Sequence, residues 1–403
     1  MKVLQINTSV NSGSTGRITE EIGKLLNDKG HLSFIAGADT EQQSSSHVIK
    51  IGSEWNKRKH GLKTRLFDRH GFGSYKSTIQ LVKEITLIKP DIIHLHNIHG
   101  YYLHIRVLFD YLKTAKIPIV WTFHDCWPFT GHCSYFDAVN CYKWQTECNH
   151  CPNLKAYPSS WGIDQSKRNF LNKRHIFNGI RSLQIIAPSK WMVQHVNHSF
   201  LSSYPLQFIN YGIDLNAFAP TASSESVRTK YNLTPNPILL GVASIWDKRK
   251  GLDDFIRLSY MLNNKAQIVL VGLTNRQMEY LPWNITGIER TENIGELVAL
   301  YSAADVFVNP TYVDNFPTTN LEALACGTPV VTYNTGGSPE AIDDFTGKVV
   351  EKGNIEVLYS SISEILLAGK NNYESMCRSR AEKLYSSSIQ YNEYLNLYKK
   401  LVL

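Results

Sequence analysis

Short apolar runs alternate with longer amphipathic stretches along the whole chain. Stretches with a helical period follow many of these runs, for example Ile18, Ile22, Leu25 and Leu26. Strands that alternate with helices predict an α/β protein with parallel sheets. The runs typical of buried strands occupy residues 2–8, 32–36, 91–97, 117–123, 183–187, 238–243, 267–271, 285–287, 306–308 and 329–332.

The chain is too long for one typical hydrophobic core. Its 403 residues predict two domains. The sequence Ser202-Ser203-Tyr204-Pro205 is typical of a linker. We therefore expect an N-terminal domain at 1–204 with a cysteine-rich insertion at 126–158, a C-terminal domain at 205–375 and a C-terminal helix at 376–403.

The stretch 305–341 places two carboxylates around the start of a predicted helix. Asp314 lies in the loop before the helix, and Glu322 follows it after seven intervening residues. Such carboxylates accept hydrogen bonds from paired hydroxyls, and the free N–H groups of residues 318–321 suit a phosphate. A phosphorylated sugar fits this pattern. The alternative is that Thr319-x-x-Glu322 is a capping box, which needs no ligand.

This stretch resembles the signature of retaining GT-B glycosyltransferases of family 4. The family pattern is close to E-x-F-x-x-x-x-x-E-A-x-A-x-G-x-P-V-V, and Asp314 stands here at the first Glu. The resemblance implies that Glu322 binds the ribose of a nucleotide and Asp314 the donor sugar. The other matching positions are Phe316, Glu322, Ala323, Ala325, Gly327, Pro329, Val330 and Val331. Donor contacts are also expected from Phe316, Pro317, Thr318, Thr319, Asn320, Gly336 and Gly337.

Adjacent cations follow the predicted strand at 238–243. Lys248, Arg249 and Lys250 precede Gly251, and such a cluster suits a pyrophosphate, although a solvated loop is the alternative. The family places an Arg and a Lys on the diphosphate, six positions apart. Lys250 matches the Lys, whereas Ser244 stands at the Arg position, which makes Arg249 the candidate for the second charge.

Two features of the N-terminal half point to the carboxyl ends of its strands. Gly13 and Gly16 lie in the loop after the first strand, and His96 and His124 follow two later strands. Ligands bind at such ends of parallel sheets. A plain turn and satisfied core histidines are the alternatives. The resemblance implies donor-phosphate or acceptor contacts for the glycines and a donor contact for His124, and we expect His96 on the acceptor side.

Five of the seven cysteines lie between residues 124 and 158. Cys133, Cys141, Cys148 and Cys151 are separated by seven, six and two residues, which is good spacing for a structural zinc ion. Reduced buried thiols or a disulfide are the alternatives. A similar loop occurs in the colanic-acid and capsule-type members of the family that this chain resembles.

The formal net charge of +7 is concentrated in one segment. Residues 50–83 hold nine Lys or Arg and two acidic residues, with Trp55, Leu62, Leu66 and Phe67 interleaved. This composition suits an anionic membrane surface. A solvated basic face is the main alternative, and nucleic acid is not expected as a partner.

No run of eighteen apolar residues is present, and the N-terminus lacks the apolar core of a signal peptide. We therefore expect a cytoplasmic protein that is peripheral on the inner face of the membrane.

The residues and the resemblance together imply a GT-B protein, with two doubly wound Rossmann-like domains facing across a cleft. The first domain would serve the acceptor and the second the nucleotide-sugar, and the last helix would pack back on the first. We expect retaining transfer of a hexose from a UDP- or GDP-sugar to a lipid-linked saccharide or an oligosaccharide, in the biosynthesis of a cell-surface polysaccharide such as capsule or O-antigen. No catalytic metal is required, since the cations and the helix N-terminus supply positive charge. The alternatives are another GT-B enzyme, such as a phosphorylase or a nucleotide-sugar epimerase, and a zinc-containing nucleic-acid-binding protein.

Overall fold

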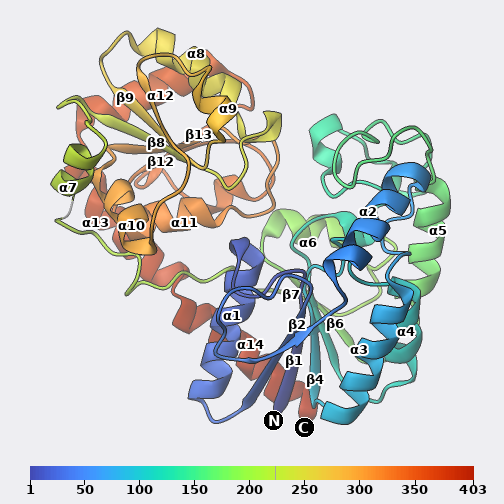
Figure 1. Ribbon diagram of the computed structural model, residues 1–403. Helices are drawn as coiled ribbons and strands as arrows, with labels where there is room; N and C mark the ends of the chain where they lie inside the picture. The colour runs from blue at the N-terminus through green and yellow to red at the C-terminus, as the bar shows by residue number, and fades with distance from the viewer. Residues whose placement is uncertain (223) are drawn as a thin grey trace. The chain divides into compact units, whose positions relative to one another are not determined.

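The computed structural model describes residues 1–222 and 224–403 and divides into two compact units (Figure 1). Unit 1 comprises Met1–Asn210 and Tyr391–Leu403, and unit 2 comprises Tyr211–Gln390. The boundary comes later than the expected linker at 202–205. The reason is that β7 (Leu206–Phe208) pairs with β6 (Leu183–Ala187) and extends the sheet of unit 1.

Unit 1 is built on a parallel sheet in the order β3-β2-β1-β4-β5-β6-β7. The order reverses at β1, which pairs with both β2 and β4, and ligands of such sheets bind at the carboxyl ends beside this reversal. The remaining strands are β1 Lys2–Ile6, β2 Leu32–Gly37, β3 His47–Lys50, β4 Ile92–Leu95 and β5 Ile119–Thr122. The helices are α1 Gly13–Asp28, α2 Glu54–Phe67, α3 Tyr75–Ile88, α4 Ile105–Thr114, α5 Ser166–Phe177, α6 Lys190–Asn197 and α14 Ser387–Val402.

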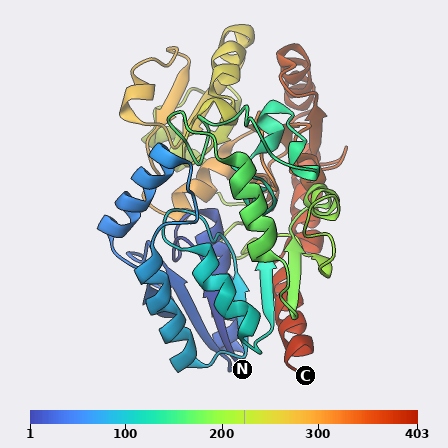
Figure 2. The ribbon, with the colours of Figure 1, turned by 90° about the vertical axis from the view of Figure 1, so that its right-hand side faces the viewer.

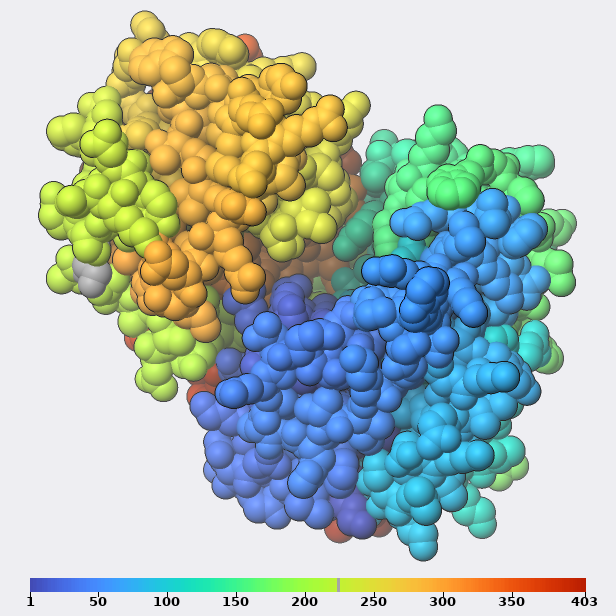
Figure 3. Space-filling model, in the orientation of Figure 1, coloured from blue at the N-terminus to red at the C-terminus, as the bar shows by residue number. Residues whose placement is uncertain are grey.

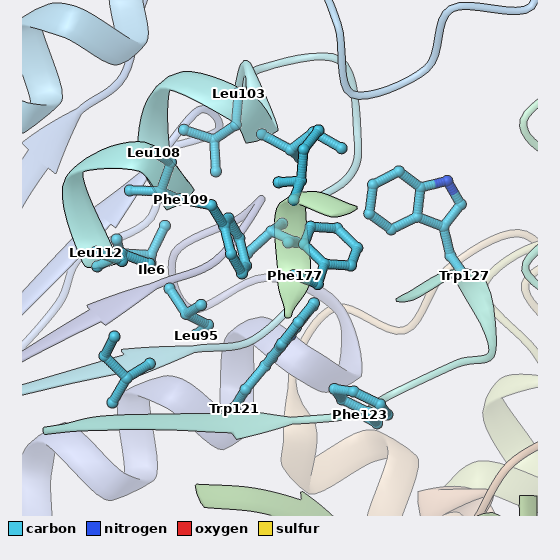
Figure 4. Close-up of a cluster of buried hydrophobic side chains, with 14 of the residues drawn as sticks. Ile6, Leu95, Leu103, Leu108, Phe109, Leu112, Trp121, Phe123, Trp127 and Phe177 are labelled. Atoms are coloured by element: carbon cyan, nitrogen blue, oxygen red, sulfur yellow. The ribbon is translucent and has the colours of Figure 1, made fainter. Parts of the chain in front are cut away.

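The two faces of this sheet are covered by different helices, because side chains alternate along each strand. Ile93 and Leu95 join the hydrophobic core beneath α3 and α4. In that core the ring centroid of Phe177 lies 4.5 Å from that of Phe109 and 5.0 Å from that of Trp121 (Figure 4). His94 points to the other face, where its Nδ1 lies 2.6 Å from the hydroxyl of Tyr398 in α14. The helix α1 covers the same face as α14 (Figures 1 and 2).

The cysteine-rich segment lies between β5 and α5 and is formed of turns and short 3-10 helices. These are η1 Trp127–Phe129, η2 Phe136–Val139 and η3 Lys143–Gln145. Phe129, Phe136 and Trp144 are buried and belong to the core of unit 1. The segment is therefore anchored by aromatic packing.

Unit 2 is built on a second parallel sheet, in the order β10-β9-β8-β11-β12-β13. Here the order reverses at β8, which pairs with β9 and β11. The strands are β8 Ile238–Val242, β9 Gln267–Val271, β10 Ile285–Ile288, β11 Val306–Asn309, β12 Val330–Tyr333 and β13 Gly347–Val350. The helices are α7 Ser224–Lys230, α8 Leu252–Leu262, α9 Asn275–Met278, α10 Ile294–Ala303, α11 Thr318–Ala325, α12 Ile355–Ala368 and α13 Asn371–Leu384.

The expected C-terminal helix is two helices, α13 and α14, separated at Tyr385 and Ser386. The part of α14 from Tyr391 onward belongs to unit 1, where Tyr394 and Tyr398 are buried. Both chain termini consequently lie at the same end of unit 1 (Figures 1 and 2). In the described part of the chain, no helix combines the length and the apolar character needed to span a bilayer.

Candidate functional site

The helix α11 starts without a side-chain cap. It begins at Thr318, and Pro317 occupies the N-cap position, where its side chain has no oxygen to offer. The capping box of Thr319 and Glu322 is therefore not formed. Helix geometry leaves the N–H groups of Thr318 and Thr319 without intrahelical acceptors, which is the property required for phosphate binding. The N–H of Asn320 instead donates to the carbonyl of Pro317 at 3.2 Å.

Glu322 lies one turn into α11 and is 3% exposed. Its Oε2 accepts a hydrogen bond of 2.9 Å from the hydroxyl of Tyr301 in α10. A buried carboxylate is stable only when hydrogen-bond donors surround it, and it then becomes a strong acceptor for further hydroxyls. Tyr301 was missed at the sequence level, because nothing in the spacing of α10 indicates that it faces Glu322.

The turns that follow β8 and β11 are bonded to each other. Lys250 Nζ lies 2.6 Å from Asp314 Oδ2, and both side chains are 20% exposed. Arg249 donates from Nη1 to the carbonyl of Val313 at 3.3 Å, and Tyr312 N–H donates to the carbonyl of Arg249 at 2.7 Å. The structure thus joins the predicted sugar-binding carboxylate directly to the predicted diphosphate-binding cation.

Two glycines permit these turns to approach closely. A Cβ on Gly251, where φ is +75°, would lie 2.3 Å from the carbonyl oxygen of Pro310. A Cβ on Gly336, where φ is +54°, would lie 1.6 Å from the carbonyl oxygen of Asp314. Gly337 N–H donates to the carbonyl of Asn315 at 2.9 Å. The glycine turn after β12 therefore packs against the loop that carries Asp314.

The predicted donor contact of Phe316 needs a correction. Its side chain is 2% exposed and packs against the rings of Tyr211 and Tyr385 at 5.9 and 6.0 Å. The buried ring supports the loop from inside, and only the backbone of Phe316 remains a candidate for ligand contact. Asn320 is also fully buried, and its Oδ1 accepts from Asn309 at 2.8 Å, whereas Thr318 and Thr319 are half-buried.

A hollow of unit 2 is lined by a different set of side chains. It includes Lys248 and Gly251 but neither Asp314 nor Glu322. Its other lining residues are Asp253, Asp254, Arg257 and Tyr312. The hollow therefore borders the turn of Lys248–Lys250 but does not contain Asp314 or Glu322.

In unit 1, the predicted histidines are hydrogen-bonded to each other. His96 follows β4 and His124 follows β5, and His96 Nδ1 lies 3.0 Å from His124 Nε2. Their rings are stacked with centroids 5.2 Å apart. The sequence placed both residues at strand ends, but it did not indicate that they contact each other or that Gln5 joins them.

Gln5 determines which nitrogens of these histidines are protonated. The Gln5 amide nitrogen Nε2 donates a hydrogen bond of 2.8 Å to the carbonyl of Thr19. The amide oxygen Oε1 therefore faces His96 Nε2 at 3.1 Å and accepts a hydrogen bond from it. Burial lowers the pKa of His96 well below its ordinary value, so the ring is neutral and Nδ1 accepts from His124 Nε2–H. Burial also lowers the pKa of His124 to about 3. The chain of bonds therefore leaves His124 Nδ1 as a hydrogen-bond acceptor.

The glycines after β1 occupy the first turn of α1. Gly13 is the first helical residue, has a φ of +66° and has open space around the position of a Cβ. A Cβ on Gly16 would lie 3.0 Å from Ser9 Oγ and 3.2 Å from the Ser9 carbonyl. Gly16 therefore lets the loop after β1 pack closely on the start of α1, which bears no side-chain cap.

The four cysteines predicted to bind zinc line one cavity in unit 1. All of them are free thiols, and Cys133, Cys141, Cys148 and Cys151 line the cavity together with His132. Across residues 1–222 and 224–403, however, no three His, Cys, Asp or Glu side chains form a group ready to hold a metal ion. The structure brings the predicted ligands together without confirming the zinc ion.

The helix α2, which belongs to the positively charged segment 50–83, buries small and polar residues and exposes its leucines. His60, Gly61 and Thr64 face inward, whereas Leu62 and Leu66 are exposed. Trp55 is 70% exposed. A second exposed ring, that of Trp161 from the segment between β5 and α5, lies beside α2, because the backbone N–H of Trp161 donates to the carbonyl of Arg65 at 2.8 Å. Both segments lie on the surface in Figure 3, where α2 is blue and the end of the cysteine-rich segment is green.

The sequence matches two protein-family models. Residues 15–217 match the one described as glycosyltransferase family 4. Residues 236–368 match the one described as glycosyl transferases group 1. The two matches cover most of unit 1 and the segment of unit 2 from β8 to α12.

Similar proteins include named bacterial glycosyltransferases. An Escherichia coli K12 protein named as the colanic acid biosynthesis glycosyl transferase WcaC is 27% identical, with 100% of both chains covered. The N,N'-diacetylbacillosaminyl-diphospho-undecaprenol alpha-1,3-N-acetylgalactosaminyltransferase of Campylobacter jejuni is 29% identical over 60% of this chain and 68% of its own.

Solved structures show the same fold over the whole length. Sucrose-phosphate synthase from Thermosynechococcus elongatus has a TM-score of 0.75 at 19% identity, covering 99% of this chain and 98% of its own. HepE of Anabaena in complex with UDP-glucose has a TM-score of 0.69 at 14% identity, covering 99% and 100%. With the family 4 match extending over half of the sequence and this fold shared from end to end, the chain belongs to glycosyltransferase family 4 and is a GT-B glycosyltransferase.

Proposed function

We propose that unit 2 binds a UDP- or GDP-sugar at the carboxyl ends of β8 and β11. The observation that supports this most is the Lys250–Asp314 pair, which lies at the reversal of strand order, where parallel sheets bind their ligands. The uncapped start of α11 and the buried Glu322 belong to the same loop and helix after β11. The names of similar structures agree with a uridine nucleotide, since HepE was solved with UDP-glucose.

In this proposal each group acts on one part of the donor. Glu322 accepts hydrogen bonds from the ribose hydroxyls, and Asp314 accepts from hydroxyls of the hexose. Lys250, with Arg249 as the second cation, and the N–H groups of Thr318 and Thr319 stabilise the charge that develops on the departing diphosphate. Gly336 and Gly337 shape the wall of the site. The turn residue Pro317 leaves the helix N-terminus open.

The stereochemistry that we propose is retention. No side chain in this set is an obvious covalent nucleophile, so departure of the diphosphate and attack by the acceptor would occur on one face of the sugar. Under this scheme the cations and the helix N-terminus serve the role that a divalent metal has in other transferases.

Unit 1 is proposed to bind the acceptor and to contact the donor. His124 is placed to contact the donor sugar, and its bond to His96, which in turn is bonded to Gln5, fixes the orientation of its ring. Gly13 leaves open space at the start of α1 for a phosphate or a saccharide, and Gly16 lets the loop after β1 pack closely beside it. The names of the relatives refer to colanic acid and to an undecaprenol-linked saccharide. We therefore propose a lipid-linked saccharide as acceptor, in the biosynthesis of a cell-surface polysaccharide.

Calorimetry with UDP, GDP and ADP tests the donor, and we expect one of the first two to bind at least about tenfold more tightly than ADP. Incubation with the matching nucleotide-sugars should then yield free nucleoside diphosphate and a product of unchanged anomeric configuration, which NMR detects. Hexose 1-phosphate formed from inorganic phosphate would identify a phosphorylase instead. An altered sugar still attached to its nucleotide would identify an epimerase, and RNA binding without nucleotide-sugar affinity would contradict the transferase proposal altogether.

We further propose that α2 docks on the inner face of an anionic membrane. Its exposed apolar side chains stand among Arg58, Lys59 and Arg65, a combination that suits phospholipid acyl chains beneath acidic headgroups. A helix with leucines at helical spacing normally buries them, and this helix buries a histidine and a threonine instead. The inverted burial is the observation that favours docking over a solvated basic face.

Vesicle sedimentation tests the docking surface. The wild-type protein should sediment with phosphatidylglycerol-containing vesicles and much less with phosphatidylcholine alone. The double variant Leu62→Asp, Leu66→Asp should lose at least about tenfold in partitioning, because each buried methylene contributes about 0.8 kcal/mol. Leu367→Asp is the matched control, since Leu367 is an exposed leucine of unit 2 outside any proposed site. Equal sedimentation with both kinds of vesicle would contradict the proposal.

A further inference from the structure

The cavity of the cysteine-rich segment gathers four thiols that have no role in the proposed transferase reaction. Its thiols, Cys133, Cys141, Cys148 and Cys151, come from separate turns and form no disulfide. Gly131 N–H points at Cys148 Sγ, 3.2 Å away. Backbone N–H groups that donate to sulfur stabilise thiolates in preference to thiols. Cys148 therefore has a backbone donor in place for a thiolate.

His132 supplies an independent observation at the same cavity. Its side chain is 2% exposed, and its Nδ1 lies 2.6 Å from Asp68 Oδ1. Its Nε2 is buried and has no hydrogen-bond partner within the described structure. A buried ring nitrogen without a partner carries a free-energy cost of about 1–3 kcal/mol. A cysteine sulfur in the cavity that forms a hydrogen bond with this nitrogen would remove that cost.

Lys173 is a second buried cation beside the thiols. Its ammonium donates to the carbonyls of Trp127 at 2.7 Å and of Thr130 at 3.0 Å, and it lies 3.5 Å from the centre of the Trp127 ring. Among the residues that the structure describes, no carboxylate is hydrogen-bonded to it. Burial of a lysine is tolerated when a negative charge lies nearby. The carboxylates of Asp68 and Asp125 act on the Lys173 ammonium through their charge, and four thiolates around a divalent metal ion, which retain a net negative charge, would add to them.

We propose that these four thiols bind one structural Zn²⁺, and that His132 and Lys173 stabilise the metal-bound thiolates. Rotation about the Cα–Cβ bonds is the movement that would bring the four sulfurs, which already line one cavity, onto a common ion. Four sulfur ligands give zinc its closed tetrahedral coordination, without an open position for catalysis. The Asp68–His132 pair then orients the surroundings of the metal, as outer-shell carboxylates do.

This metal site would be joined to the end of α2. Asp68 is the C-cap residue of α2, and its Oδ2 accepts a hydrogen bond of 2.8 Å from the backbone N–H of Gln165. Zinc binding would therefore fix the cysteine-rich segment against the helix that we propose to dock on lipid. This inference does not depend on the identity of the donor or the acceptor.

Metal analysis of the full chain, purified after growth with zinc, should find about one zinc ion per chain. Cys141→Ser and Cys148→Ser should each retain less than about half an equivalent, since three thiolates and a water form a weaker site. The control Cys126→Ser, which changes a buried thiol outside the cavity, should keep its zinc. His132→Gln should keep one equivalent but lose it to a chelator at a concentration lower by about 10- to 100-fold.

Thiol titration of the wild-type protein distinguishes the remaining outcomes, even where a serine variant fails to fold. In the native protein the four thiols should be protected from a thiol reagent and should become reactive, with stoichiometric release of zinc, when a chelator is added. Four reactive thiols and no zinc would overturn the proposal, as would iron in place of zinc. Retention of zinc by Cys141→Ser together with its loss from His132→Gln would replace the four-thiolate site by one in which His132 is a ligand.

Discussion

Lys250→Met is expected to lower kcat by about 10²- to 10³-fold, the usual effect of removing one preorganised charge from a developing anion. The loss should appear in kcat more than in the nucleotide affinity, because the charge on the diphosphate grows as the sugar departs. Steady-state kinetics with the preferred donor measure this. Lys248→Met is the matched control, since Lys248 belongs to the same 3-10 turn but its side chain is exposed, and the partner of Asp314 is Lys250.

A double-mutant cycle distinguishes the catalytic role of Lys250 from a purely structural ion pair with Asp314. If the two residues only stabilise each other, the variant Lys250→Met, Asp314→Asn should recover most of the activity lost by either single change. In our proposal Asp314 binds the hexose and Lys250 the diphosphate, so the double variant should be at least as impaired as the worse single variant. Recovery of activity would contradict the proposed roles.

Glu322→Gln is expected to weaken nucleotide binding by about 30- to 150-fold, with little change in thermal stability. Hydrogen bonds to a charged acceptor contribute about 1.5–3 kcal/mol, compared with about 0.5–1.5 for neutral ones, and two ribose hydroxyls are affected. Gln keeps the shape of the side chain and can still accept the proton of Tyr301, which preserves the packing of α10 on α11. Calorimetry and thermal unfolding of the same preparation measure both quantities.

Tyr301→Phe provides the comparison for Glu322. It removes the hydrogen bond of 2.9 Å but leaves the carboxylate charge, so it should cost about 1 kcal/mol of stability and much less of the nucleotide affinity. A Glu322→Gln protein that unfolds at a much lower temperature, yet binds nucleotide normally when folded, would show that Glu322 has a structural role only.

The sequence was sufficient to predict the strands that are buried on both faces. Continuous apolar runs marked β1, β4, β5, β8 and β11, because both faces of these central strands are covered by helices. It missed β3 and β7, which are short and partly exposed strands at the edges of the sheet, and β13 at the edge of the other. These three edge strands lack a continuous run of buried apolar residues, whereas β10, which is also at an edge, was predicted from residues 285–287.

The candidate site was located from the sequence, but its contacts were not. Asp314 and Glu322 could be found because their spacing is a property of one segment. The bond of Asp314 to Lys250 joins residues 64 positions apart, and that of His96 to Gln5 joins residues 91 apart. The burial of Phe316 and the exposure of Leu62 likewise depend on which side chains happen to surround them in the fold. Such information exists only in three dimensions.

The position of α14 has a consequence for how the protein is made. Tyr394 and Tyr398 reach Thr122 and His94 through hydroxyl contacts of 3.2 and 2.6 Å, so the last residues of the chain complete the interior of unit 1. These residues follow unit 2 in the chain, so a ribosome releases them only after it has released unit 2. The first half of the protein must therefore wait, with one face of its sheet only partly covered, while unit 2 emerges and folds. We expect nascent chains to be most dependent on chaperones during that interval.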